Sequence, residues 1–262
     1  MINGLPIEYA QARLQARYGA RASESLWSQV RSARSLAALL ESLRDSPVKR
    51  WVGAVNAEAD ADVIELHLRQ AFRECVEEVA RWVPDTWRPA VQWTRTLVDL
   101  PAVVRLANGE AALGWMRRDP TLQAYADPDP DIAGRALASG PLRNIVRKLE
   151  LSAGVVHGAR HQVAREQWLI EWRLRWPDTD GEEAAALTGL TRIVLDHLAR
   201  FTATDIEDPW ALRRDLASQV AARFRRHAFT ATAVFAYLLL TALDLERLRA
   251  HLVVRATFGA MP

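Results

Sequence analysis

Cysteine and lysine are almost absent from this sequence of 262 residues. Cys75 is the single cysteine, and Lys49 and Lys148 are the only lysines. One thiol cannot close a disulfide within the chain, which excludes a disulfide-stabilised scaffold and fits a reducing compartment such as the cytosol. The 12 glycines exclude a collagen-like repeat, and a hydrophobic share of 50% excludes a wholly disordered chain. The length suits one large domain or two small ones with a substantial core.

The sequence also lacks an excess of charge of either sign. The 34 basic and 32 acidic residues leave a formal net charge of +2, and almost all of the basic residues are arginine. So balanced a chain has no general electrostatic attraction to nucleic acid, and no nucleic-acid partner is predicted. The most basic cluster, Arg223–His227, is a candidate nucleic-acid patch, but a charged helix end ahead of a buried helix is the favoured interpretation. Arg13, Arg17 and Arg21 share one helical face and are expected to be solvated or ion-paired.

Motifs that carry catalysis or cofactors are missing as well. The sequence contains no nucleotide P-loop, no dinucleotide-binding fingerprint and no Gly-x-Ser-x-Gly turn. We therefore expect no catalytic residue and no cofactor. His157 and His161 are the best metal candidate, because their spacing places them on one face of a helix. Two solvated histidines on a surface helix are favoured over a metal site, so no metal ligand is predicted.

Apolar residues recur at helical spacing along most of the chain, and no useful length of alternating β pattern occurs. The sequence therefore predicts an all-α fold. Helices are expected in the ranges 7–43, about 61–79, 142–151, 155–176, 183–201, 209–227 and 228–258. The expected start signals are, in chain order, Ser23 or Ser25, Asp60 or Asp62, the Thr204 and Asp205 stretch, and Pro209. The pair Glu65 and Arg69 has the favourable four-residue spacing of a helical ion pair.

Proline, aspartate and glycine are dense in residues 117–141, which is typical of a connector. The sequence predicts a single domain over 1–262, with internal lobes of about 1–116 and 142–262 joined by this segment. The uncharged run Ala228–Leu243 is shorter than the roughly 20 residues that cross a bilayer. A buried core helix is therefore favoured there over a membrane span.

Trp168, Trp172 and Trp176 form a row at four-residue spacing. Such a row is a candidate partner surface, because tryptophan is frequent at the energetic centre of protein interfaces. A seam within the core is the favoured alternative, with each indole N–H reaching an acceptor at its edge.

The C-terminal stretch Tyr237–Arg249 resembles the last helix of the C-subunit family of V-type and archaeal-type ATPases, which includes the relatives of the eukaryotic d-subunit. Tyr237, Asp244, Leu248 and Arg249 are in register with that helix, and Thr241 stands where the family commonly has lysine. The resemblance extends to the N-terminal region through two shorter matches. These matches involve Tyr9 with Arg13, and Glu65 with Leu68.

This resemblance implies a funnel of helical lobes, shortened here, and a non-catalytic central-stalk subunit of a rotary ATPase. The implied partners are the membrane rotor ring and the central shaft. The implied location is cytoplasmic and peripheral to the membrane, which agrees with the lack of a secretion leader at the N-terminus. Two alternatives stay open at this point. They are a free-standing helical adaptor and, less favoured, a metal-binding helical-bundle enzyme that uses His157 and His161.

Overall fold

The computed structural model describes residues 6–152, 154, 157–201 and 208–259. Within these ranges the chain is helical and contains no strand, which confirms the all-α prediction. The helices are α1 (Ile7–Gly19), α2 (Glu24–Ser32), α3 (Leu36–Leu43), α4 (Lys49–Val52), α5 (Ala61–Ala80), α6 (Arg88–Trp93), the 3-10 helix η1 (Thr94–Asp99), α7 (Leu100–Ala107), α8 (Gly114–Arg118), α9 (Pro130–Ser139), α10 (Arg143–Leu151), α11 (His157–Arg173), α12 (Gly181–Phe201), α13 (Pro209–Arg226) and α14 (Ala231–Phe258).

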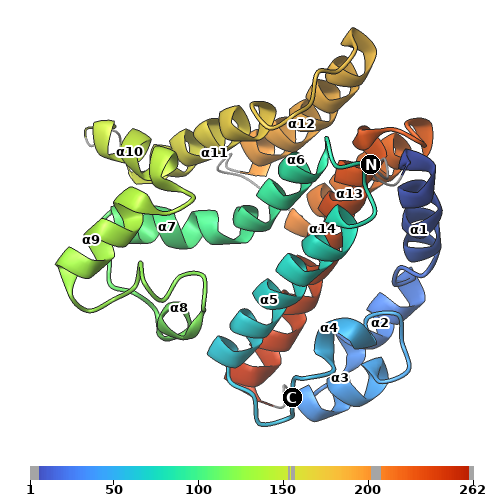
Figure 1. Cartoon of the computed structure of the whole chain (residues 1–262). Helices are drawn as coiled ribbons and strands as arrows, with labels where there is room; N and C mark the ends of the chain where they lie inside the picture. Colours follow the sequence, from blue (N-terminus) through green and yellow to red (C-terminus); the bar gives the residue numbers. More distant parts are fainter. Residues whose placement is uncertain (1–5, 153, 155–156, 202–207, 260–262) are drawn as a thin grey trace.

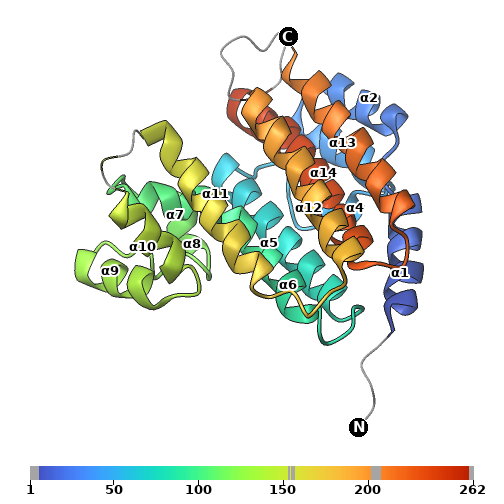
Figure 2. The same cartoon turned by 90° about the horizontal axis from the view of Figure 1, so that it is seen from above.

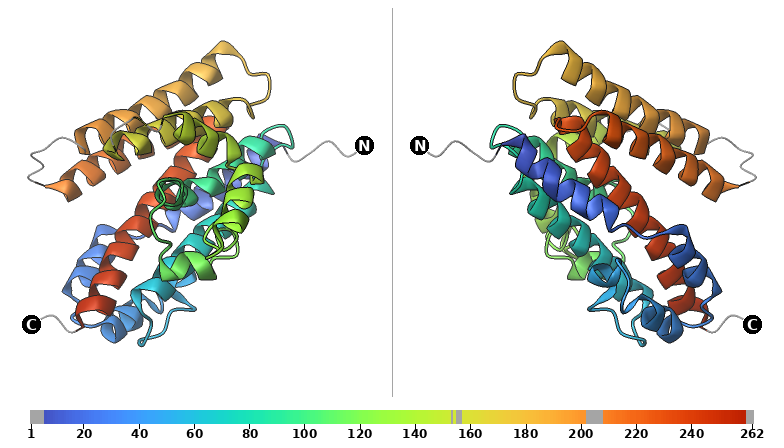
Figure 3. Two further views of the ribbon diagram at one scale, coloured as in Figure 1. Left: turned by 90° about the vertical axis from the view of Figure 1, so that its left-hand side faces the viewer. Right: turned by 90° about the vertical axis from the view of Figure 1, so that its right-hand side faces the viewer.

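Two long helices, α5 and α14, pack side by side through the middle of the molecule (Figure 1). Each brings a stripe of apolar side chains to the contact, and Leu68 of α5 and Leu248 of α14 are both buried. Figure 3 shows this pair as neighbouring diagonal rods, with α12 crossing their upper end. Helices α1, α3, α12 and α13 pack on α14, and α4, α6, η1 and α8 pack on α5, so α5 and α14 form the spine of the fold.

Local signals in the sequence set where several helices begin. The hydroxyl of Ser23, and not that of Ser25, accepts a hydrogen bond from the Leu26 amide at the start of α2. Asp60 in turn accepts from the Val63 amide and starts α5. Pro209 occupies the first turn of α13, as expected. The stretch expected at Thr204 and Asp205 lies outside the described residues.

The uncharged run Ala228–Leu243 forms most of the first half of α14, where nearly every side chain is buried. No helix within the described ranges has both the length and the apolar character that a bilayer span requires. Just before α14, Phe229 adopts a positive φ of 64° and its backbone N–H donates to the side chain of Gln11. The basic cluster Arg223–His227 lies at the end of α13, ahead of this buried helix, as the favoured interpretation requires.

The segment 117–141 differs from the expected connector. Helix α9 lies inside it, with Asp129 as its N-cap and Pro130 in its first turn. Leu122 and Tyr125 are buried in the core, so this stretch packs as part of the fold. The Asp–Pro pairs that are typical of turns also start helices, because proline fits the first helical turn. Figure 2 shows α7, α8, α9 and α10 grouped on one side of the spine.

Buried side chains from both expected lobes belong to one continuous core. Cys75 lies in this core on α5, with only 3% of its surface exposed. Burial raises the pKa of the Cys75 thiol to about 11. The thiol is therefore protonated at neutral pH and is not a nucleophile in the folded protein.

Candidate docking groove

The residues that carry the family resemblance join the two helices of the spine. Glu65 of α5 accepts hydrogen bonds from Arg69 on its own helix, at 2.6 Å, and from Arg249 on α14. The expected ion pair between Glu65 and Arg69 is therefore present. Glu65 is 7% exposed, and two guanidinium groups compensate its charge. This pairing fixes the register of α14 along α5.

A second pairing ties the start of the chain to α14. Arg21, which follows α1, donates two hydrogen bonds of 2.8 Å to the two carboxylate oxygens of Asp244. Such a two-point contact fixes direction as well as distance. Burial disfavours the Arg21 cation, but its hydrogen bond to Asp244 and the attraction of that carboxylate raise the pKa of Arg21 above its ordinary value. Tyr237, earlier on α14, accepts a 3.4 Å hydrogen bond from Arg50.

Tyr9 and Arg13 do not join this cluster. Arg13 is exposed and donates a 2.8 Å hydrogen bond to the hydroxyl of Tyr9, which is partly buried against the core. Among the other arginines of that face, Arg17 forms an ion pair with Glu78. Of the resemblance residues, the structure thus pairs Glu65 of α5 with Arg249 of α14, whereas Tyr237 and Asp244 pair with other arginines and the pair on α1 stays apart.

The tryptophan row is largely a core seam, with Trp168 and Trp172 on α11 and Trp176 just beyond its end. Trp168 and Trp172 are buried, and Trp176 is partly buried. The Trp168 indole N–H donates to the Thr96 hydroxyl at 2.8 Å, and the Trp172 ring meets the Phe235 ring edge to face with 4.8 Å between their centroids. The expectation that each indole N–H reaches an acceptor is wrong for Trp172 and Trp176, whose N–H groups are buried without a hydrogen-bond partner. A partner cannot contact Trp168 and Trp172 in this conformation, so the candidate partner surface predicted from the row is not accessible there.

An open polar groove lies beside Asp244, between α2, α13 and α14, and has a volume of about 800 Å³. It is lined by five arginines and three carboxylates, namely Arg21, Arg31, Arg213, Arg214 and Arg247 with Glu24, Asp208 and Asp244. Arginine therefore exceeds the acidic residues in the lining. In the described part of the chain, Arg31 forms no ion pair, and its guanidinium donates at 2.7 Å to the Ser28 hydroxyl. The other four arginines are ion-paired, Arg21 with Asp244, Arg213 with Glu246, Arg214 with Asp208 and Arg247 with Glu24. The positive charge that no carboxylate balances in the groove is therefore that of Arg31, on the α2 side.

Aromatic side chains stand among these arginines. Arg247 lies over the Trp27 ring at 4.5 Å, and Arg213 lies over the Trp210 ring at 5.2 Å. Trp210 is 37% exposed and stacks on His251 with an angle of 7° between the rings. Exposed tryptophan beside arginine is the combination that dominates binding energy at protein interfaces. The groove is therefore suited to holding a segment of a partner that carries acidic and apolar side chains.

His251 is neutral at physiological pH in this environment. Burial, together with the positive charges of Arg255, Arg247 and Arg31, lowers the pKa of His251 from 6.5 to about 4. The Trp210 ring, which stacks on the His251 ring, carries no charge. The positive charge of the groove therefore comes from arginine, which does not titrate near neutral pH.

The depressed pKa of His251 predicts a loss of stability in mild acid. Between about pH 6.5 and pH 4, the unfolded chain binds a proton at His251 and the folded chain does not, so acidification favours unfolding. We expect the free energy of unfolding to fall less in H251Q than in the wild type when the pH is lowered from about 7 to about 4.5. Urea unfolding at both pH values measures this difference. Burial also lowers the pKa of His197 and of His227, and both are present in the two proteins. An equal fall in the free energy of unfolding would therefore contradict the assignment of the effect to His251.

Sequence reasoning missed the groove, although part of its signal was present. Trp210 with Arg214, and Arg247 with His251, each have four-residue spacing and therefore share a helix face. The missing information was that α2, nearly two hundred residues earlier, closes the third side. That juxtaposition depends on tertiary packing and has no local signature.

No group of three or more histidine, cysteine, aspartate or glutamate side chains with the arrangement of a metal site occurs among the described residues. His157 begins α11, and its side chain lies outside what the structure describes. Comparison with known protein families, with curated proteins and with solved structures finds no match to this chain.

Proposed function

We propose that this chain is a non-catalytic helical docking protein, and specifically the central-stalk subunit of a V-type or A-type rotary ATPase. In this role it lies between the membrane rotor ring and the central shaft, and its helical lobes form a shortened funnel. It holds its partners by shape and charge and carries out no chemistry of its own.

The observation that carries the proposal is the ion pair between Glu65 of α5 and Arg249 of α14 at the spine. The two regions of the resemblance that bear on the spine, Glu65 with Leu68 and Tyr237–Arg249, lie about 170 residues apart in the sequence. Glu65 of the first region pairs with Arg249 of the second, and Asp244 of the second is held by Arg21. If the residues shared with the family determine how its helices pack, they are expected to form contacts between those helices. The buried carboxylate of Glu65 is well suited to this, because a buried charge left without its partner is strongly destabilising.

The cationic groove supports the docking part of the proposal. An excess of arginine on a rigid rim steers an acidic partner into place and penalises a basic one. Trp27 and Trp210 add apolar area that a partner side chain covers on binding. We expect the segment that enters the groove to carry aspartate or glutamate next to an apolar residue.

The test is affinity purification of the tagged full-length chain from gently solubilised membranes of its own organism, with mass spectrometry of the proteins retained. The groove variant is R31E combined with W210A, which reverses the charge of the arginine that has no ion pair and removes the exposed indole. The matched control is R34E, because Arg34 is exposed and lies outside the groove. Circular dichroism and thermal unfolding verify that each variant is folded.

We expect the wild type and R34E to retain nucleotide-binding head subunits and rotor-ring subunits, and the groove variant to retain at least about tenfold less of them. Retention of soluble proteins only, with no rotary ATPase subunit, would refute the stalk assignment in favour of the helical adaptor. Full retention of the ATPase subunits by the groove variant would refute the role of the groove.

A further inference from the structure

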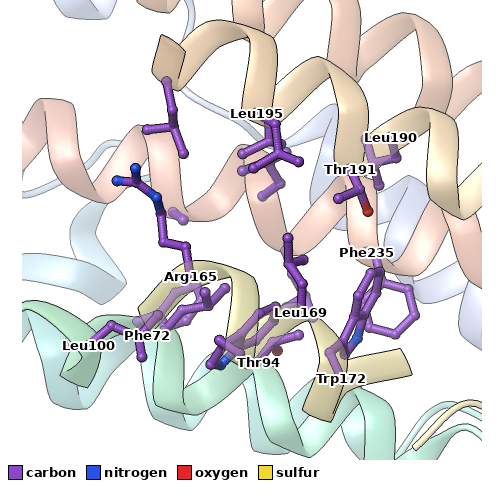
Figure 4. A pocket seen from close by; sticks show the side chains of 17 residues that line it. Phe72, Thr94, Leu100, Arg165, Leu169, Trp172, Leu190, Thr191, Leu195 and Phe235 are labelled. Carbon is purple, nitrogen blue, oxygen red and sulfur yellow. The ribbon is translucent and has the colours of Figure 1, made fainter. Parts of the chain in front are cut away.

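An apolar cavity of about 180 Å³ lies between α11 and α12, with side chains of α5, η1, α7 and α14 completing its wall (Figure 4). Its lining is formed mainly by leucine and aromatic side chains. The two hydroxyl groups in the wall are already satisfied, since Thr94 donates to the Val91 carbonyl at 2.7 Å and Thr191 donates to the Leu187 carbonyl at 3.0 Å. The Trp172 indole N–H is buried without a hydrogen-bond partner. Apart from it and the Arg165 side chain, the wall gives water little to bind and favours an apolar occupant.

The cavity opens to the surface beside two leucines. Leu97 of η1 is 38% exposed and Leu195 of α12 is 39% exposed, and both line the cavity. Water at these side chains is unfavourable, and an apolar molecule that enters the cavity covers them. The opening also gives a route of entry that needs no separation of helices.

One charged side chain, Arg165, lines this apolar space. It extends from α11 toward α12 at one end of the cavity, and Trp172 and Phe235 lie at the other end (Figure 4). Its Nε atom is buried and has no hydrogen-bond partner. No ion pair to Arg165 is present in the described part of the chain. Burial lowers the pKa of Arg165, and the carboxylate of Glu166 opposes this effect from a distance.

A cation in this position lacks the partner that partly buried charges usually have. Arginine presents parallel N–H groups that match a carboxylate at two points. An anionic head group at Arg165 would therefore satisfy the guanidinium while its apolar tail fills the space toward Trp172. The phosphate of a larger lipid is a poorer match, because the volume of the cavity limits the tail.

We propose that the cavity between α11 and α12 binds a medium-chain carboxylate, with its alkyl chain among the leucines and tryptophans and its carboxylate on Arg165. An apolar cavity of roughly 150 Å³ takes up a molecule of the size of benzene. A volume of about 180 Å³ thus suits a chain of about six to eight carbons. This site is separate from the groove, and the proposal does not depend on the rotary ATPase assignment.

The test is calorimetric titration of the full-length protein with octanoate, hexanoate and octanol. Tryptophan fluorescence gives an independent readout, because Trp168 and Trp172 line the cavity. We expect octanoate to bind about fourfold more tightly for each methylene that it has beyond hexanoate. We expect R165Q to weaken octanoate by at least about tenfold and to leave octanol within about twofold. R173Q is the control, because Arg173 is an exposed arginine on the same helix that does not line the cavity.

A second variant separates loss of binding from loss of folding. V194F places a larger apolar side chain at the cavity wall, so we expect it to abolish binding of octanoate and octanol without lowering the melting temperature. Octanoate and octanol binding equally well, with R165Q weakening neither, would overturn the role of Arg165. Absence of octanoate binding by the wild type, or unchanged binding by V194F, would overturn the site.

Discussion

Replacing Arg73 with methionine is expected to lower the free energy of unfolding by about 3–5 kcal/mol. Arg73 lies on α5, is 6% exposed, and is the shared partner of two buried carboxylates, Asp99 at 1% and Asp119 at 0%. It donates to both oxygens of Asp119, at 3.0 and 2.8 Å, and to Asp99. Methionine fills much of the same space but leaves the two carboxylates without their cation.

The same variant is expected to depend on pH more steeply than the wild type. Burial already raises the pKa of Asp99, and the attraction of Arg73 opposes this. Without Arg73, the pKa of Asp99 rises further, so on acidification the folded variant binds a proton at pH values where the same carboxyl of the unfolded chain is still ionised. The free energy of unfolding of the variant therefore rises on acidification from about pH 7 to about pH 5. The difference in this free energy between the wild type and the variant becomes smaller over the same range.

Urea unfolding of the two proteins at both pH values measures these effects. R81M is the control, because Arg81 is exposed at the end of α5, and we expect it to change stability by about 0.5 kcal/mol or less. Adding D99N and D119N to R73M removes the unpaired charges and is expected to restore part of the loss. A cost of R73M below about 1 kcal/mol would contradict the assignment of this network as a single ionic unit.

Replacing Arg255 with methionine is expected to cost about 2–4 kcal/mol, because three carbonyl groups lose a charged donor. Arg255 lies on α14 and is 5% exposed. Its guanidinium donates to the carbonyls of Val30, Arg31 and Ala33, at 2.9, 3.1 and 2.7 Å, and so caps the C-terminal end of α2. The last carbonyls of a helix have no partner within the helix, and a basic side chain is one way of satisfying them.

Loss of this cap is expected to promote local unfolding of α2 more than unfolding of the whole molecule. Amide hydrogen exchange in R255M is therefore expected to quicken more in α2 than in α5, and urea unfolding gives the global cost. R255K is expected to recover only part of the loss, because an ammonium group cannot reach three carbonyls in the fork geometry of arginine. R226M, at an exposed position on α13, is the control. Equal exchange rates in α2 of R255M and the wild type would show that other contacts hold this helix.

Features that depend on neighbours in the sequence were the most predictable. The N-caps at Ser23 and Asp60, the pair Glu65 and Arg69, and the burial of the first half of α14 each follow from spacing within a few residues. The segment 117–141 shows the limit of such signals. Asp129 and Pro130 satisfy the rules for a turn and for a helix start equally well, and the burial of Leu122 decides between them only after folding.

Features that join distant parts of the chain were not predictable. Arg255 reads as one more basic residue on a long helix, and its acceptors lie more than two hundred positions earlier. The tryptophan row was ambiguous because helical spacing is the same for a core seam and for a partner surface. The cap, the groove and the cavity each need the relative placement of three or more helices, and no pattern along one helix encodes that placement.

The buried thiol of Cys75 has a practical consequence for the spine. Cys75 stands on α5 and contacts the Tyr237 hydroxyl of α14, so a reagent reaches it only when these helices part. As the single cysteine, it is also the only thiol that such a reagent can modify. The rate of alkylation in the native protein therefore records how often the spine opens, and the chain reports that motion without any engineered label.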